Sequence, residues 1–176
     1  MTDTTTSQPG PRVPPSVWRN PWHFLAFGFG SGAMRKAPGT WGTLAGLLFV
    51  PLLQLLPHWG YGLVLLLGSL FGFWLCGKVA RELGVHDHEG IVWDEFVGIW
   101  ITLWLAPDGW AWLLLGFLLF RLFDILKPWP ISWVDRQMHG GFGIMLDDIL
   151  AGLAAWLALQ AIAGYWGLGL MAAWFV

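Results

Sequence analysis

Six ionisable side chains interrupt the most apolar stretches of this sequence, and their types suit chemistry. They fall into three close pairs, Asp94 with Glu95, Arg121 with Asp124, and Asp147 with Asp148. A charge at the centre of a bilayer costs about 2.5 to 3.5 kcal/mol by insertion scales, and less near the surface. Retaining six of them therefore indicates either a function or close pairing. The alternative is that these charges only anchor helix ends at the membrane surface.

Clustered carboxylates with few histidines suit a hard divalent cation that takes oxygen ligands. Mg²⁺ in particular is held by one or two carboxylates, water molecules and a substrate phosphate. Residues 35–43 have features of a phosphate site, because two cations and a Pro-Gly turn precede Thr40. Thr40 is a predicted N-cap, and the free N–H groups at a helix start favour an anion. An ordinary capped helix start explains the same pattern.

The composition places this chain in a membrane. Of its 176 residues, 56% are hydrophobic and 11% are charged, whereas soluble domains carry about 25% charged residues. The net charge of −2 lacks the basic excess that nucleic-acid binding needs, so no nucleic acid is expected as a partner. Cys76 is the single cysteine, which excludes a disulfide framework and a cysteine-based zinc site.

The apolar runs predict an all-α fold, a polytopic bundle of about five membrane helices with interfacial segments. A helix needs roughly 17 to 20 residues to cross a hydrocarbon core of ~30 Å. The predicted membrane helices are residues 40–56, 60–77, 91–106, 110–126 and 144–164, preceded by an interfacial segment at 17–29. Residues 1–16 are expected to form a disordered polar tail, and residues 17–176 a single membrane-embedded domain. The oligomeric state stays open.

Positive charges predict the orientation, because Lys and Arg stay on the cytoplasmic side of short loops. Basic residues precede the first predicted helix, follow the second and follow the fourth, while the connections at 57–59 and 107–109 contain none. This pattern predicts a cytoplasmic N-terminus, five crossings and an outer C-terminus. All six ionisable side chains then lie at similar depth near the cytoplasmic surface, where they can line one pocket.

Small residues indicate which helix faces meet, since they let membrane helices approach closely. One such stripe contains Asp94, Gly98 and Thr102, and a second contains Asp148, Gly152 and Ala155. A third begins at Asp147 and continues with alanines at the same helical spacing. The spacing therefore does not decide which of the two neighbouring aspartates faces the other helices.

Five sequence blocks in fixed order carry a family resemblance. The blocks are residues 28–32 (GFGSG), 37–43 (APGTWGT), 91–98 (IVWDEFVG), 120–130 (FRLFDILKPWP) and 140–148 (GGFGIMLDD). Together they closely resemble the phosphatidylglycerophosphatase A family. The resemblance implies a Mg²⁺-dependent lipid phosphatase of the bacterial inner membrane that converts phosphatidylglycerophosphate to phosphatidylglycerol. Its active site is expected to face the cytoplasm, where this lipid precursor is made.

The resemblance also implies roles for the polar residues. Catalytic roles are expected for Asp94, Glu95, Asp124 and Asp148, with Glu95 binding metal or orienting water. Mg²⁺ is expected at Asp94, Asp124 and one or both of Asp147 and Asp148, and the substrate phosphate at Lys36, Gly39, Thr40, Thr43, Arg121 and Lys127. Lys127 is equally explained as a surface anchor. The nucleophile is either a metal-activated water or a carboxylate that forms an aspartyl phosphate.

Two other functions fit parts of the pattern. A transporter or channel uses intramembrane acids, but here the acids lie at one end of the helices and no internal repeat is visible. A Mg²⁺-dependent phosphotransferase uses similar residues. It differs in its products, because it transfers the group to another alcohol and releases no free phosphate.

Overall fold

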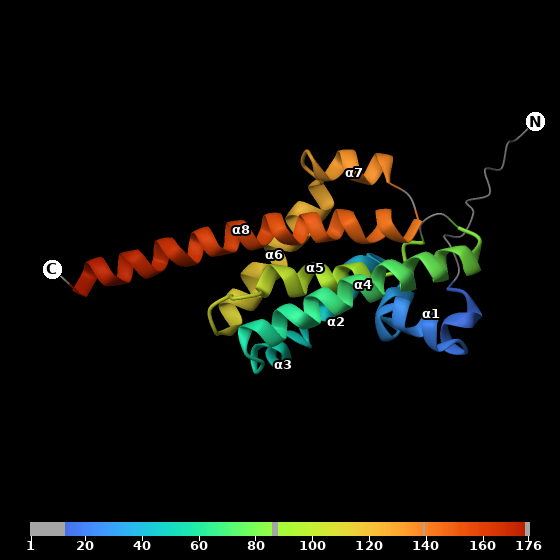
Figure 1. Ribbon diagram of the computed structural model, residues 1–176, viewed down its shortest axis with the longest axis horizontal. Coiled ribbons are helices and arrows are strands. Elements are labelled where there is room, and N and C mark those ends of the chain that lie inside the picture. Colours follow the sequence, from blue (N-terminus) through green and yellow to red (C-terminus); the bar gives the residue numbers. More distant parts are fainter. Residues whose placement is uncertain (1–12, 86–87, 139, 175–176) are drawn as a thin grey trace, which may run out of the picture.

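The computed structural model describes residues 13–85, 88–138 and 140–174, with side chains through Tyr165. These residues are helical with no strand, which confirms the all-α prediction (Figure 1). The elements are η1 (Pro15–Trp18), α1 (Pro21–Ala26), η2 (Gly28–Ala33), α2 (Pro38–Leu47), α3 (Val50–Gln54), α4 (His58–Leu83), α5 (Trp93–Leu103), α6 (Trp110–Leu126), α7 (Ile131–Gln137) and α8 (Gly140–Trp174). Most of the predicted polar tail, residues 1–12, lies outside the described residues.

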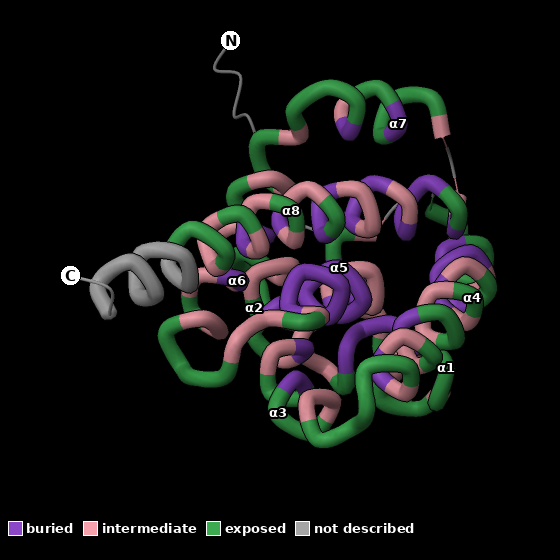
Figure 2. The backbone as a smooth tube through the Cα atoms, turned by 60° about the vertical axis from the view of Figure 1, so that its left-hand side comes forward, coloured by how far each residue is buried: buried purple, intermediate pink, exposed green. Residues whose placement is uncertain are grey.

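Helix α5 is the centre of the bundle. Every residue from Phe96 to Leu103 is buried, and α2, α4, α6 and α8 pack around this helix (Figure 2). Helix α8 approaches closely: Thr102 Oγ1 donates to the carbonyl oxygen of Gly152 on α8 at 3.3 Å, and to that of Gly98 on its own helix at 2.9 Å. The predicted small-residue stripes on these two helices therefore do face each other.

Side chains of α8 pair with the backbone just beyond the end of α5. Beyond Leu103 the backbone turns away from the helix, with Trp104 extended and Leu105 at a φ of 61°. The carbonyl oxygen of Trp104 accepts from Trp156 Nε1 at 2.8 Å, and the carbonyl oxygen of Leu105 accepts from Gln160 Nε2 at 3.2 Å. These donors give partners to two carbonyl groups in the connection that follows α5.

The first predicted membrane helix is broken into α2 and α3. Helix α2 ends at Leu47, and α3 begins at Val50. Pro51 explains the break, because its ring has no N–H to donate and clashes with the carbonyl four residues earlier, which is that of Leu47. At 1.5 Å per residue, the 10 residues of α2 are about 15 Å long.

Five membrane-spanning helices were expected, but only some of the five predicted segments form a continuous helix of sufficient length. All five apolar runs are helical, but two described helices are long and apolar enough to cross a membrane by length and composition, α4 and residues Gly140–Tyr165 of α8. Helix α6 has 17 residues and α5 has 11. A helix of 11 residues rises about 16 Å, which is half of a hydrocarbon core.

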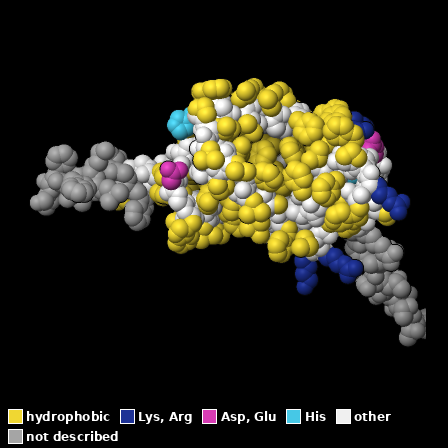
Figure 3. Space-filling view, turned by 90° about the horizontal axis from the view of Figure 1, so that it is seen from below, with side chains coloured by type: hydrophobic (Ala, Val, Ile, Leu, Met, Phe, Trp, Pro, Cys, Tyr) yellow, Lys and Arg dark blue, Asp and Glu magenta, His cyan; other side chains and the backbone are white. Residues whose placement is uncertain are grey.

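The two ends of the bundle differ in character. The α3–α4 and α5–α6 connections lie at one end, and the C-terminus of α4 and the N-terminus of α8 lie at the other (Figure 1). Figure 3 shows hydrophobic side chains over the middle of one face, with Lys and Arg side chains toward the end where α4 finishes. Such a broad exposed apolar surface is suited to contact with acyl chains.

A polar chain ties the N-terminal elements to α4. The ring of His23 on α1 is buried, with Ser16 Oγ 3.0 Å from Nδ1 and Glu82 Oε2 2.9 Å from Nε2. Glu82 also pairs with Lys78 one turn earlier on α4. The predicted interfacial segment is therefore three short helical elements docked on the bundle.

Candidate active site

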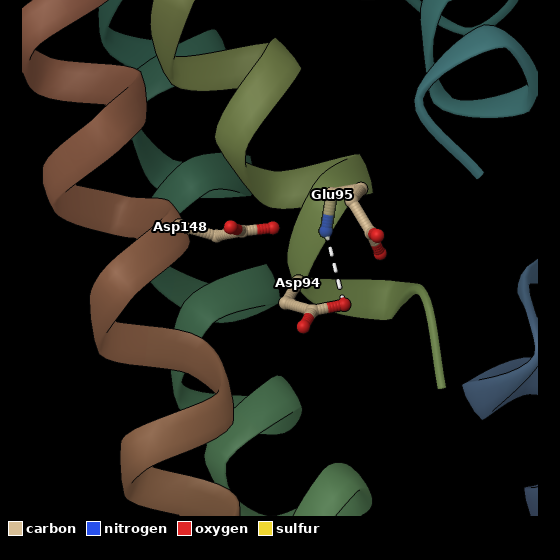
Figure 4. A group of neighbouring side chains, drawn as sticks. All are labelled: Asp94, Glu95 and Asp148. Atoms are coloured by element: carbon tan, nitrogen blue, oxygen red, sulfur yellow. Dashed lines mark hydrogen bonds between the residues drawn. The ribbon is translucent and has the colours of Figure 1, made fainter. Parts of the chain in front are cut away.

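Three carboxylates from two helices meet at one point. Asp94 and Glu95 lie in the first turn of α5, and Asp148 reaches toward them from α8 (Figure 4). One carboxylate oxygen from each residue lies within 4.8 Å of the others. The backbone N–H of Glu95 donates to Asp94 Oδ1 at 3.1 Å. Acidic residues are favourable in a first helical turn, where the helix dipole is positive.

Two glycines allow α8 to bring Asp148 this close. A Cβ atom on Gly152 would lie 2.7 Å from the carbonyl oxygen of Gly98, closer than real Cβ contacts. A Cβ atom on Gly98 would collide with the ring of Phe120. Only residues without a side chain permit this crossing, and Asp148 lies one turn before it on α8.

Helix α6 contributes a fourth acid and a cation. Asp124 lies close enough for its charge to act on both Asp148 and Glu95. Arg121 Nη1 donates to Asp124 Oδ2 at 2.5 Å, so these two residues form an ion pair. Both side chains are largely shielded, at 15% and 14% exposure. The cluster of three carboxylates therefore has a fourth acid nearby, Asp124, which is paired with Arg121.

Asp147 and Asp148 have different surroundings. Asp147 Oδ2 accepts from Lys127 Nζ at 2.7 Å, and the same ammonium lies 2.5 Å from Asp135 Oδ1 on α7. Burial acts to lower the pKa of Lys127, but its hydrogen bonds to the two aspartates outweigh burial and raise that pKa above its usual value. Asp148 is thus the aspartate that joins Asp94 and Glu95, while Asp147 faces Lys127.

The start of α2 borders the carboxylate cluster. A Cβ atom on Gly39 would collide with Glu95 Oε1 and lie 3.3 Å from Arg121 Nη1. Thr43 is fully buried, and its Oγ1 donates to the carbonyl oxygen of Gly39 at 2.8 Å and accepts from Arg121 Nη1 at 3.4 Å. Three residues predicted to bind phosphate, Gly39, Thr43 and Arg121, are therefore neighbours.

The prediction that Thr40 caps α2 is wrong. The N-cap position is Ala37, in a left-handed conformation with a φ of 50°, and no side chain caps the helix. Pro38 begins the helix earlier than predicted because its fixed φ suits the first helical position. Thr40 is half-buried within the first turn, and Lys36 is exposed in the preceding turn.

The donor set fits a divalent cation. Carboxylate oxygens are the ligands that Mg²⁺ prefers, and the excess of negative charge in a shielded site favours a bound cation. Asp94, Glu95 and Asp148 supply these oxygens from α5 and α8, and Asp124 of α6 is near Asp148. An arginine beside them is placed to neutralise an anionic substrate group.

Residues 28–32 form a tight turn whose packing partner is not predicted by the sequence. Gly28, Phe29 and Gly30 have φ values of 55°, 57° and 90°, so the chain turns tightly inside η2. Gly32 lies against the carbonyl of Gly90, where a Cβ atom would collide. This loop therefore supports the segment that leads into α5. The glycine pattern signals a tight turn, but its partner is distant in sequence.

Comparisons with known proteins show which family this chain resembles. A family model described as Phosphatidylglycerophosphatase A matches residues 24–163. The chain is 51% identical over 153 residues to phosphatidylglycerophosphatase A of Escherichia coli, covering 86% of this chain and 89% of that relative. It is 52% identical over 149 residues to the protein of the same description in Haemophilus influenzae, covering 84% and 91%. No solved structure matches the chain.

Proposed function

The chain belongs to the phosphatidylglycerophosphatase A family, an enzyme family of lipid phosphatases, and we propose that it hydrolyses the terminal phosphomonoester of phosphatidylglycerophosphate. The products are phosphatidylglycerol and inorganic phosphate. The observation that carries this proposal is the meeting of Asp94, Glu95 and Asp148 beside Arg121. All of these residues lie within the matched part of the chain.

We propose that Asp94, Asp124 and Asp148 hold Mg²⁺, which supplies charge neutralisation at the phosphate and a lowered pKa for bound water. Arg121 binds phosphate oxygens, held in place by Thr43 and Asp124. Lys36, Gly39 and Thr40 border the phosphate at the start of α2. Phosphoryl transfer depends mainly on positioning and charge stabilisation, and these residues provide both.

Lys127 and Asp147 have a different place in the proposed site. Lys127 already binds two carboxylates, Asp135 on α7 and Asp147 on α8. We propose that this ion pair joins α6, α7 and α8 and so holds Asp148 in position, instead of contacting phosphate or metal directly. Burial of the Asp147 side chain to 12% exposure supports a stable pair.

We propose a multi-pass position in the bacterial inner membrane with the site at the cytoplasmic surface. Helices α4 and α8 cross the bilayer, while α2 with α3, α5 with its following connection, and α6 complete further crossings. The paired carbonyl groups just beyond α5 support this position, because backbone groups within a bilayer need partners from the protein. Residues 17–176 then act as one domain around α5.

Phosphate release by purified protein tests the proposal. With short-chain phosphatidylglycerophosphate, we expect activity with Mg²⁺ and loss of activity after chelation. Asp94→Asn, Asp124→Asn and Asp148→Asn should each lower kcat by about 10²-fold or more, since each removes a charge that stabilises the transition state. Asp108→Asn is the matched control, because Asp108 is exposed in the distant α5–α6 connection.

Several outcomes would contradict this proposal. Full activity in all three site variants would remove the assigned residues from the reaction. Transfer of phosphate to an added alcohol without release of free phosphate would favour a phosphotransferase. Ion flux through proteoliposomes without phosphate release would favour a transporter. Trapping a phosphorylated protein during turnover would identify an aspartyl phosphate, whereas we propose attack by water.

A further inference from the structure

A buried histidine on α1, His23, has no part in the proposed reaction chemistry. The residue is 4% exposed, and its ring lies between Ser16 Oγ, 3.0 Å from Nδ1, and Glu82 Oε2, 2.9 Å from Nε2. An ionised carboxylate only accepts hydrogen bonds, so Nε2–H of the neutral ring donates to Glu82 and Nδ1 accepts from the Ser16 hydroxyl. The ring of His23 therefore links η1, α1 and α4 at one point.

The other end of α1 holds the start of α5. Helix α1 ends at Ala26, whose carbonyl oxygen accepts from the backbone N–H of Val92 at 2.8 Å. Val92 is the N-cap residue of α5, and no side chain of the described residues caps that helix. Ala26 and Val92 are both fully buried, so water offers no alternative partner for this N–H group. The hydrogen bond therefore ties the first turn of α5 to α1.

Close packing reinforces the link between α1 and α5. A Cβ atom on Gly90 would lie 2.4 Å from the ring of Phe27, the residue that directly follows α1. A Cβ atom on Gly28 would lie 2.7 Å from the side chains of both Val92 and Phe96. Interiors packed this tightly transmit a displacement to their neighbours. A shift of α1 on α4 therefore also moves the start of α5.

The first turn of α5 carries two of the three clustered carboxylates, Asp94 and Glu95. The third, Asp148, comes from α8, so the distance between the two groups depends on where α5 begins. We propose that His23 is a positioning residue for the phosphatase reaction. By docking α1 on α4, it holds the first turn of α5 at the distance from Asp148 that the reaction requires. This inference rests on the proposed function, because it assigns the reaction to these carboxylates.

Two substitutions of His23 separate its hydrogen bonds. Glutamine places its amide near the position of Nε2 and keeps a donor for Glu82, whereas asparagine places its amide near Nδ1 and loses that bond. We expect His23→Gln to keep kcat within about threefold and His23→Asn to lower it about 10- to 100-fold, because small displacements of reacting groups are costly. The KM for lipid should change by less than about threefold, since the proposed phosphate contacts on α2 and α6 stay in place.

Hydrogen exchange, resolved to single backbone amides, measures the link itself without lipid or metal. The amide of Val92 should exchange at least about tenfold faster in His23→Asn than in the unaltered protein, and within about threefold in His23→Gln. The amide of Thr102, in the buried part of α5, is the internal control. Its exchange should be unchanged, because α5 is displaced at its start and does not unfold.

Two variants on α4 provide a matched comparison. Glu82→Ala removes the acceptor for His23 and should reproduce the effects of His23→Asn on kcat and on the Val92 amide. It also tests the inference if His23→Asn does not fold. Lys78→Met is the control, because Lys78 pairs with Glu82 from within α4 and its loss leaves the bond to His23 in place. We expect Lys78→Met to keep kcat within about twofold.

The outcomes separate this inference from the proposed function. Unchanged kcat in His23→Asn and Glu82→Ala would overturn the inference. A lower kcat without faster exchange at Val92 would also overturn it, as would equally faster exchange at Val92 and Thr102, which would show a general loss of stability. Release of no phosphate by the unaltered protein would overturn the proposed function, whereas the exchange measurement would still report whether His23 ties α1 to α5.

Discussion

Asp147 and Asp148 are adjacent in sequence but differ in the groups they contact. One residue step on a helix rotates a side chain by about 100°, which directs Asp148 to α5 and Asp147 to Lys127. The sequence predicts that this pair belongs to the site, but each aspartate leads a stripe of small residues. Which stripe meets α5 depends on how α8 is rotated, and that is decided by the Gly98–Gly152 contact.

Exchanging each aspartate for asparagine separates their roles. Asp148→Asn should lower kcat by about 10²-fold or more, because it removes a charge from the carboxylate cluster. Asp147→Asn should lower kcat by roughly tenfold or less, because Lys127 keeps Asp135 as a partner. Phosphate release at saturating Mg²⁺ measures both. An equal loss of kcat in the two variants would show that Asp147 also acts directly on the reaction.

At the scale of elements, hydropathy predicts the positions of the helices. It does not predict whether protein or lipid surrounds each helix. All five apolar runs are helical, but a run such as residues 91–106 is apolar because protein surrounds α5 on every side. Hydropathy does not distinguish burial in protein from burial in lipid. The break between α2 and α3 could have been predicted from Pro51, because its ring clashes with the preceding helical turn. Helix α7, by contrast, depends on Ile131 and Val134 finding a buried position on the bundle.

The crossing of α5 and α8 should be sensitive to one methyl group. Gly152→Ala places a Cβ atom 2.7 Å from the Gly98 carbonyl oxygen, so we expect a loss of about 1 to 3 kcal/mol in the free energy of unfolding. Gly62→Ala is the matched control within α4, where the nearest atom is 3.6 Å away. There the higher helix propensity of alanine should stabilise the protein by up to about 1 kcal/mol.

Denaturant unfolding in detergent measures both glycine variants. A Gly152→Ala protein as stable as the Gly62→Ala protein would show that α8 can move away without cost. The rate of phosphate release by the same two variants provides a second, independent test. Because Asp148 lies one turn before the crossing, a shift of α8 should also lower activity.

At the scale of the whole molecule, the bundle has one polar end and an apolar belt. The cluster of acids lies near the start of α5 and of α8, which is the end opposite the α5–α6 connection (Figure 1). The sequence predicts this asymmetry from the distribution of Lys and Arg. In the proposed orientation, a headgroup phosphate would lie at this polar end while the acyl chains stay against the belt.

Labelling of single cysteines tests the orientation. Cys76 is fully buried, so Cys76→Ala gives a background with little reactivity. In this background Asp108→Cys and Arg136→Cys place exposed thiols in the α5–α6 connection and on α7. A membrane-impermeant maleimide should label position 108 in intact spheroplasts and position 136 only after permeabilisation, because Lys and Arg stay inside. Labelling of both positions from the same side would contradict the proposed topology.

The carbonyl groups beyond α5 that accept from Trp156 and Gln160 also impose an order on biogenesis. Until the ribosome has made α8, a nascent chain has neither these donors nor Asp148. Helix α8 thus supplies both the partners of this backbone and one carboxylate of the proposed site. We expect a translation product that ends after α7 to release no phosphate from the lipid.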